Sequence, residues 1–63
     1  MDSIGKKLIE YRKVRRLSQK QVAEWLTMHG CPTHHNQVSR WEQGKGEPSL
    51  QQFFLLCELY GID

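Results

Sequence analysis

The stretch "LSQKQVAEWLTMHGCPTHHNQVSRWEQGKG", residues 17–46, decides the fold, because two helix patterns stand on either side of a helix-breaking segment. Ser18 precedes Gln21 by three residues, the capping-box spacing at which two side chains satisfy free amides at a helix start. A helix over residues 19–28 is therefore expected. Its apolar residues recur on one face and predict the side that packs inward: Val22, Ala23 and Leu26.

The segment after this helix forces a turn and then permits a second helix. Gly30 and Pro32 stop the first helix. Thr33 is then in position to cap a helix that runs to Gln43, at about residues 33–43, where Gly44 ends it. The inward residues of this helix are few, and its other sides are polar: Val38 and Trp41 inside, with His34, His35, Asn36, Gln37, Ser39 and Arg40 around them.

Helical patterns also flank this central pair. A first helix is expected over residues 4–16, with Ser3 as its cap and apolar residues every three or four positions. Ser49 and Gln52 repeat the capping-box spacing and open a last helix that ends at Gly61. No stretch alternates with period two as a strand would. The sequence thus predicts an all-α, compact four-helix domain whose core is Ile4, Leu8, Leu17, Val22, Ala23, Leu26, Val38, Trp41, Leu50, Phe53, Leu56, Cys57 and Tyr60.

Composition limits the class of protein. A chain of 63 residues makes one domain, and a domain this short buries about 60% of the surface that its unfolded chain exposes. Two cysteines are too few for the disulfide framework of a secreted mini-protein, so free thiols and a cytoplasmic location are expected. We see no signal peptide or membrane-length apolar run, and therefore expect no membrane partner.

The charge is distributed unevenly along the chain. Residues 1–20 carry seven Lys or Arg and two acidic side chains, a net +5, whereas residues 21–63 carry two basic and five acidic side chains, a net −3. Such asymmetry is typical of a one-sided electrostatic footprint for a polyanion, although a basic first helix is as often simply a solvated face.

The polar side of the helix at 33–43 has the chemistry of a base reader. Arg pairs with guanine through two hydrogen bonds, and Asn or Gln pairs in the same way with adenine. A solvated helix face more often shows Lys and Glu, and this helix has neither before Glu42. The pattern favours a helix that enters the major groove of duplex DNA.

Three segments together carry a resemblance to a known family. They are "LSQKQVAEWL" at 17–26, "VSRWEQGKGEPSL" at 38–50 and "FFLLCELYGI" at 53–62, and with "IGKKLIEYRK" they cover nearly the whole chain. The chain resembles the phage-repressor or Cro-type, XRE-like, helix-turn-helix family. This resemblance implies sequence-specific binding of double-stranded DNA by a transcriptional regulator, a repressor, without a cofactor.

The resemblance also implies roles for individual residues. Base-contacting positions of the family correspond to His35, Asn36 and Arg40, with Ser39 beside them. Phosphate-contacting positions correspond to Ser18, Gln19, His34, Gln37 and Lys45, and a helix N-terminus is independently an anion site. Glu47 stands where the family often has a base, which weakens the grip expected there.

A family ion pair that ties the first helix to the end of the third corresponds to Arg12 and Glu42. The alternative is that Arg12 belongs to the basic face. The pair would orient the recognition helix.

The turn between the two central helices departs from the family. From Leu26 to Trp41 this chain is longer by about five residues than family members usually are, so a lengthened turn is expected. We expect Trp25 and Met28 to pack against Cys31 and Pro32 and hold this turn in place. His29, Cys31, His34 and His35 are of the residue types that bind zinc, but the paired-cysteine spacing is absent, so no metal site is expected.

The last helix has apolar residues outside its main stripe, Leu55, Leu59 and Phe54. They are expected to meet a second subunit or a further domain. We therefore expect residues 1–63 to be one helix-turn-helix domain, the N-terminal part of a longer regulator that binds a two-fold operator as a homodimer.

Other functions remain as alternatives. The same fold serves protein interaction, as in antitoxins. An enzyme is not expected, because no nucleophile with an adjacent base and no phosphate-binding glycine loop is evident, and no small-molecule substrate is indicated.

Overall fold

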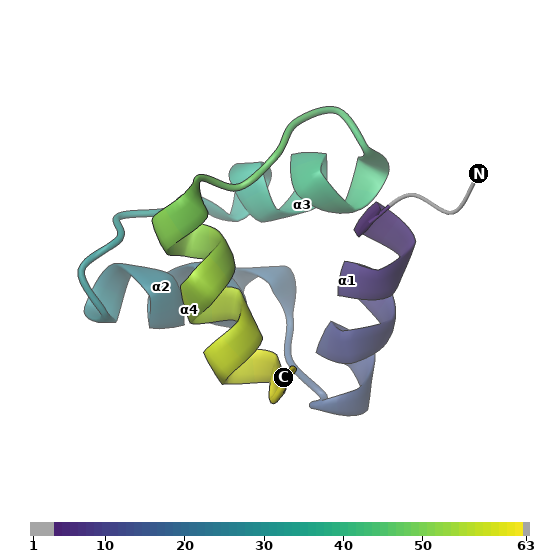
Figure 1. The fold of residues 1–63 in the computed structure, drawn as a ribbon, viewed down its shortest axis with the longest axis horizontal. Coiled ribbons are helices and arrows are strands. Elements are labelled where there is room, and N and C mark those ends of the chain that lie inside the picture. Colours follow the sequence, from purple (N-terminus) through teal and green to yellow (C-terminus); the bar gives the residue numbers. More distant parts are fainter. Residues whose placement is uncertain (1–3, 63) are drawn as a thin grey trace.

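The structure is a computed structural model that describes residues 4–62, and these residues form four α-helices. They are α1 (Ile4–Val14), α2 (Gln19–Met28), α3 (His35–Gln43) and α4 (Leu50–Tyr60). Both α1 and α2 pack on α3, and α4 packs on α2 (Figure 1). The described residues contain no strand, so the expected all-α, four-helix architecture is confirmed.

The first helix is shorter than expected. It ends at Val14 instead of residue 16, because Arg16 adopts a left-handed conformation with φ 57°. The amide of Leu17 then donates to the carbonyl of Arg12, which closes the helix end without a glycine. The expected cap Ser3 lies outside the described residues.

The expected caps of α2 and α4 are present. The Ser18 hydroxyl accepts from the amide of Gln21 while the Gln21 side chain accepts from the amide of Ser18, and Ser49 and Gln52 repeat this box. Gly44 and Gly61 end α3 and α4 in the left-handed conformation that glycine adopts without strain.

The cap of α3 is different from the one expected. His34, not Thr33, is the N-cap residue: its Nδ1 accepts from the amide of Asn36, and the Gln37 side chain accepts from the amide of His34. The Thr33 hydroxyl is used elsewhere, because it donates to the carbonyl of Cys31.

The core lies where the four helices meet. Its fully buried side chains are Val22, Leu26, Val38 and Leu56, surrounded by Leu8, Ala23, Trp41 and Tyr60. Two residues expected in the core are exposed instead: Ile4 is 49% and Leu50 is 70% exposed, because both start a helix at the edge of the molecule. Three others of the expected core are half-buried: Leu17, Phe53 and Cys57.

The turn at residues 29–34 joins α2 to α3, where the sequence predicts a turn between these helices. Cys31 is buried in the core and its amide donates to the carbonyl of Leu26. The Thr27 hydroxyl accepts from the amide of Thr33, which fixes the second half of the turn to α2. The turn is therefore held from inside by Cys31.

Met28 is not buried against this turn as expected: it is 81% exposed and lines an open groove together with Thr33. Trp25 packs partly against the core and stacks on His29, with 3.8 Å between ring centroids.

The first helix approaches the end of α3 closely at Gly5. A Cβ atom at this position would lie 2.5 Å from the carbonyl oxygen of Glu42 and 2.8 Å from that of Trp41. Only glycine permits this contact, and it positions the C-terminal turn of α3 against α1. In the described part of the chain, none of the helices has the length and apolar character needed to span a membrane.

Candidate nucleic-acid interface

The outward side of α3 is polar and accessible. Val38 and Trp41 are 1% and 4% exposed, so they anchor the helix in the core. Asn36 and Arg40 are exposed on the opposite side, one turn apart, and His35 is exposed beside them. The structure thus brings the three expected base-contacting side chains to one accessible helix, while Ser39 is half-buried.

Two of these side chains have partners on the protein. Arg40 Nη2 donates to the carbonyl of Lys45 at 3.0 Å, which holds the guanidinium along the C-terminal turn of α3. This bond uses one of the five N–H groups of arginine and leaves the others for a base. Ser39 Oγ accepts from Gln43 Nε2 at 2.8 Å.

Gln43 is a residue that the sequence argument did not place in the site. It is exposed and lies one turn after Ser39, and its side-chain oxygen is left to accept a hydrogen bond. Gln43 lies seven residues after Asn36, and this spacing places the two residues on the same side of a helix. The spacing could therefore have identified Gln43 from the sequence.

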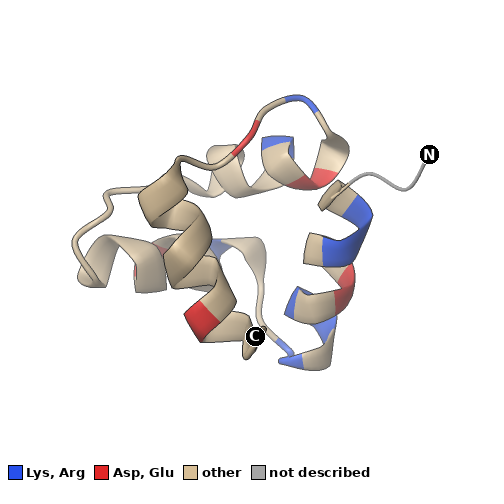
Figure 2. Cartoon of the chain, in the orientation of Figure 1, with Lys and Arg blue, Asp and Glu red and all other residues tan. Residues whose placement is uncertain are grey.

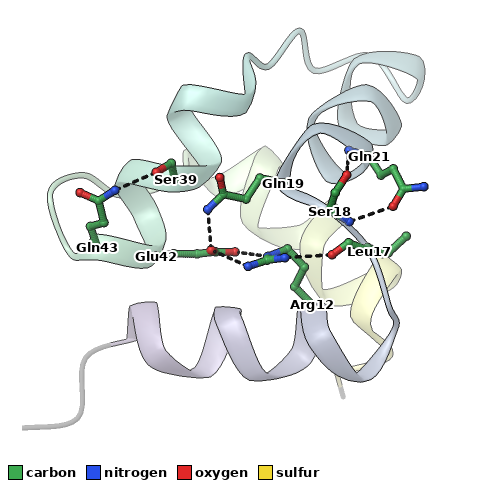
Figure 3. A network of polar contacts seen from close by, with 8 residues as sticks. All are labelled: Arg12, Leu17, Ser18, Gln19, Gln21, Ser39, Glu42 and Gln43. Atoms are coloured by element: carbon green, nitrogen blue, oxygen red, sulfur yellow. Dashed lines mark hydrogen bonds and ion pairs between the residues drawn. The ribbon is translucent and has the colours of Figure 1, made fainter.

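The C-terminal turn of α3 and the first residue of α2 contact α1 through one network of hydrogen bonds (Figure 3). Arg12 Nε lies 2.7 Å from Glu42 Oε2, and Arg12 Nη2 donates to Glu42 Oε1 at 3.2 Å. Gln19 Nε2 donates to the same Oε1 at 2.9 Å, and Arg12 Nη1 donates to the carbonyl of Leu17. The expected pair of Arg12 and Glu42 is therefore a two-pronged ion pair between α1 and α3, and Gln19 joins α2 to it.

Burial and hydrogen bonding set the electrostatics of this network. Glu42 is 7% exposed, the one charged residue that is buried among those described. Its hydrogen bond raises the pKa of Arg12, although burial opposes this. Burial, with the Glu42 carboxylate second, raises the pKa of nearby Tyr60 to about 12, and Arg12 partly offsets this.

The network changes the role open to Gln19. Its side-chain nitrogen, expected at a phosphate, is hydrogen-bonded to Glu42. The capping box uses the amides of Ser18 and Gln21, as well as the Ser18 hydroxyl. At the start of α2, the backbone amides of Gln19 and Lys20 lie outside this box and remain available to an anion.

Basic residues lie along α1 and in the turn after it, while α4 has none (Figure 2). Two of them have partners within the fold: half-buried Arg12 is paired with Glu42, and Arg15, which is exposed, donates from Nη2 to the carbonyl of Tyr60. Lys45 is exposed just after α3.

The residues considered for a metal do not gather. Cys31 is buried, and His29 stacks on Trp25. The rings of His34 and His35 are tilted against each other, with 4.3 Å between their centroids. Across residues 4–62, no three His, Cys, Asp or Glu side chains are grouped as a metal ion requires.

Two helices joined by a turn, the second with a buried apolar side and an accessible polar side, define the helix-turn-helix class of DNA-binding domain. Comparison with family models agrees: the helix-turn-helix domain matches residues 3–63, and the chain belongs to this family. No curated protein and no solved structure matches the chain significantly.

Proposed function

We propose that this domain binds duplex DNA in a sequence-specific manner as part of a transcriptional regulator, with α3 in the major groove. The observation that carries the proposal is the two-sidedness of α3. Val38 and Trp41 fix its inner side, and Asn36 and Arg40 stand accessible on its outer side. These are the side-chain types that pair with adenine and guanine through two hydrogen bonds.

In this proposal the contacts divide into two kinds. Asn36, Arg40 and His35 read base edges, with Ser39 beside them, and Gln43 extends this row toward the end of α3. Phosphates are held at the start of α2, where Ser18 and Gln19 lie, and around α3 by His34, Gln37 and Lys45. Phosphate contacts position the domain, and base contacts specify the sequence.

The finer assignment follows from the sequence resemblance. We propose that the regulator is a repressor of the phage-repressor or Cro type, that it acts in the cytoplasm, and that it binds as a homodimer to half-sites about one helical turn apart. Exposed apolar side chains at Phe54 and Leu50 support a contact with a second subunit or domain. Leu55 and Leu59 offer less, because they pack against the core.

The experiment begins with selection of bound duplexes from a random pool, which identifies the cognate sequence. Arg40→Ala should then weaken cognate binding by about 1–3 kcal/mol and relax the preference at one base pair. Lys45→Ala is the matched control, because loss of a phosphate contact weakens all sequences alike. Equal losses on cognate and random DNA for both variants would show that Arg40 does not read a base.

A further inference from the structure

A groove of about 590 Å³ lies between α2 and the start of α3. Lys20, Glu24 and Met28 of α2 line one wall, and Thr33, His34 and His35 line the other. In helix-turn-helix complexes the first helix of the motif crosses the DNA backbone while the N-terminal residues of the second reach the bases. A groove between these two parts therefore faces the sugar–phosphate strand.

The hydrogen bond at the α3 cap determines which nitrogen of His34 carries a proton. Nδ1 accepts from the amide of Asn36 at 3.2 Å, so it holds no proton. In a neutral imidazole the proton is then on Nε2, which is a donor. The ring of His35 lies against that of His34 in a tilted arrangement, with 4.3 Å between centroids, and restrains it further. His34 thus offers the groove a neutral N–H group.

Charge in the groove comes from α2. Lys20 is exposed at the second position of the helix and supplies a cation, while Glu24, one turn later, supplies an anion. Ala23 and Met28 give the groove an apolar surface, which suits a deoxyribose next to a phosphate. The groove therefore combines a cation, a neutral donor and an apolar wall.

We propose that this groove holds one phosphodiester of the DNA backbone, with Lys20 as its charge contact and His34 Nε2–H as its neutral hydrogen-bond donor. The inference rests on the proposed DNA binding and deepens it: it joins Lys20 to the phosphate contact already proposed for His34 and gives His34 the role of a neutral donor. Glu24 opposes the phosphate and lowers affinity for every sequence.

Salt dependence separates the two contacts, because only a charge contact releases counterions. On the duplex selected with the wild-type protein, Lys20→Ala should lower affinity and reduce the slope of log K against log salt by about 0.9. His34→Ser retains a good helix cap and removes the imidazole donor. It should lower affinity for cognate and random duplexes about tenfold with an unchanged slope.

Removal of the opposing charge is a third arm. Glu24→Gln should raise affinity for cognate and random duplexes several-fold at low salt. Its matched control is Glu58→Gln, an exposed carboxylate on α4, which should bind as the wild type does.

Nitrogen NMR of the free protein tests the cap separately from DNA binding. Nδ1 of His34 should show the shift of an unprotonated acceptor and Nε2 that of an N–H group. The opposite tautomer would overturn the neutral-donor contact. So would a slope of log K against log salt that is smaller by one unit in His34→Ser than in the wild type. If the wild type binds the duplex and both Lys20→Ala and His34→Ser bind equally well, the groove site fails while the proposed function stands. If the wild type binds no duplex, both fail.

Discussion

At the scale of single residues, Glu42 connects α3 to two other helices. Its carboxylate is buried and accepts from Arg12 and Gln19, which belong to α1 and α2. A buried charge is tolerated only while its partners remain, because desolvation otherwise outweighs its favourable contacts. Glu42 therefore helps to hold the C-terminal turn of α3 in place, together with the buried Val38 and Trp41.

Arg12→Ala should lower the free energy of unfolding by about 3–5 kcal/mol, because it leaves the Glu42 carboxylate buried without its cation. Chemical denaturation of both proteins measures the difference. Arg16→Ala is the control, since Arg16 is exposed in the turn after α1. An unchanged unfolding transition in both Arg12→Ala and Glu42→Ala would contradict a stabilising role for the pair.

The raised pKa of Tyr60 predicts that the protein loses stability at alkaline pH. Its pKa is raised to about 12, so the folded protein keeps the phenol proton at pH values where the unfolded chain has lost it. Stability from this group is complete below pH ~10 and falls as the pH rises toward 12, by about 2–3 kcal/mol in all. Tyr60→Phe should lack this component of the decline when unfolding is followed at increasing pH, and an identical decline would refute the prediction.

At the scale of elements, α1 and α3 are in backbone contact. Gly5→Ala places a methyl group 2.5 Å from the carbonyl oxygen of Glu42, so the helices must separate. We expect a loss of about 1–3 kcal/mol, the usual effect of overpacking, measured by thermal unfolding. Gly46→Ala is the control, because its nearest neighbour, Arg40 Nε, lies at 3.7 Å. Equal melting temperatures for the two variants would show that the contact is loose.

The turn between α2 and α3 is tied to α4 by a single side chain. Gln52 accepts from the amide of Ser49 in its capping box and donates from Nε2 to the Thr33 hydroxyl at 3.1 Å. Gln52→Glu keeps the side-chain oxygen that accepts from Ser49 and removes the nitrogen that donates to Thr33. The variant therefore separates the contribution of the capping box from that of the bond to the turn.

Gln52→Glu should cost about 0.5–1.5 kcal/mol, the net contribution of one hydrogen bond. Gln21→Glu makes the same change in the exposed box of α2, which has no tertiary bond of this kind, and should cost less. Denaturant titration of the two variants measures the difference. A loss in Gln21→Glu as large as that in Gln52→Glu would mean that the Thr33 bond contributes nothing.

At the scale of the whole molecule, charge is separated between α1 with its following turn and the rest of the chain. Arg12 is paired with Glu42 within the fold, so the positive charge available to a polyanion is smaller than the net charge of residues 1–20 indicates.

Binding to random duplex DNA should weaken as the salt concentration rises, because each phosphate contact releases counterions. The plot of log K against log salt should have a slope near −0.9 for each phosphate contacted. Titration at several salt concentrations measures this slope. Arg12→Lys should leave it nearly unchanged, because Arg12 contacts Glu42, whereas Lys45→Ala should reduce it by about one unit. An affinity independent of salt would contradict phosphate contact altogether.

Local sequence patterns are enough to predict the helices and the direction that most of their residues face. Capping boxes, glycines at helix ends and apolar periodicity are local signals, so α2 and α4 have the bounds expected from them. The inward pair Val38 and Trp41 follows from the same periodicity, and with it the accessible side of α3.

Which side chains hydrogen-bond or pack against distant parts of the chain is visible only in the three-dimensional structure. Gln19 donates to a carboxylate 23 residues away, Cys31 fills the core from a turn, and Gly5 permits a backbone contact with α3. His34 caps α3 because Thr33 is held by Cys31, Thr27 and Gln52. The physical reason is that these contacts join segments distant in sequence, and periodicity and capping patterns describe only neighbours along one helix.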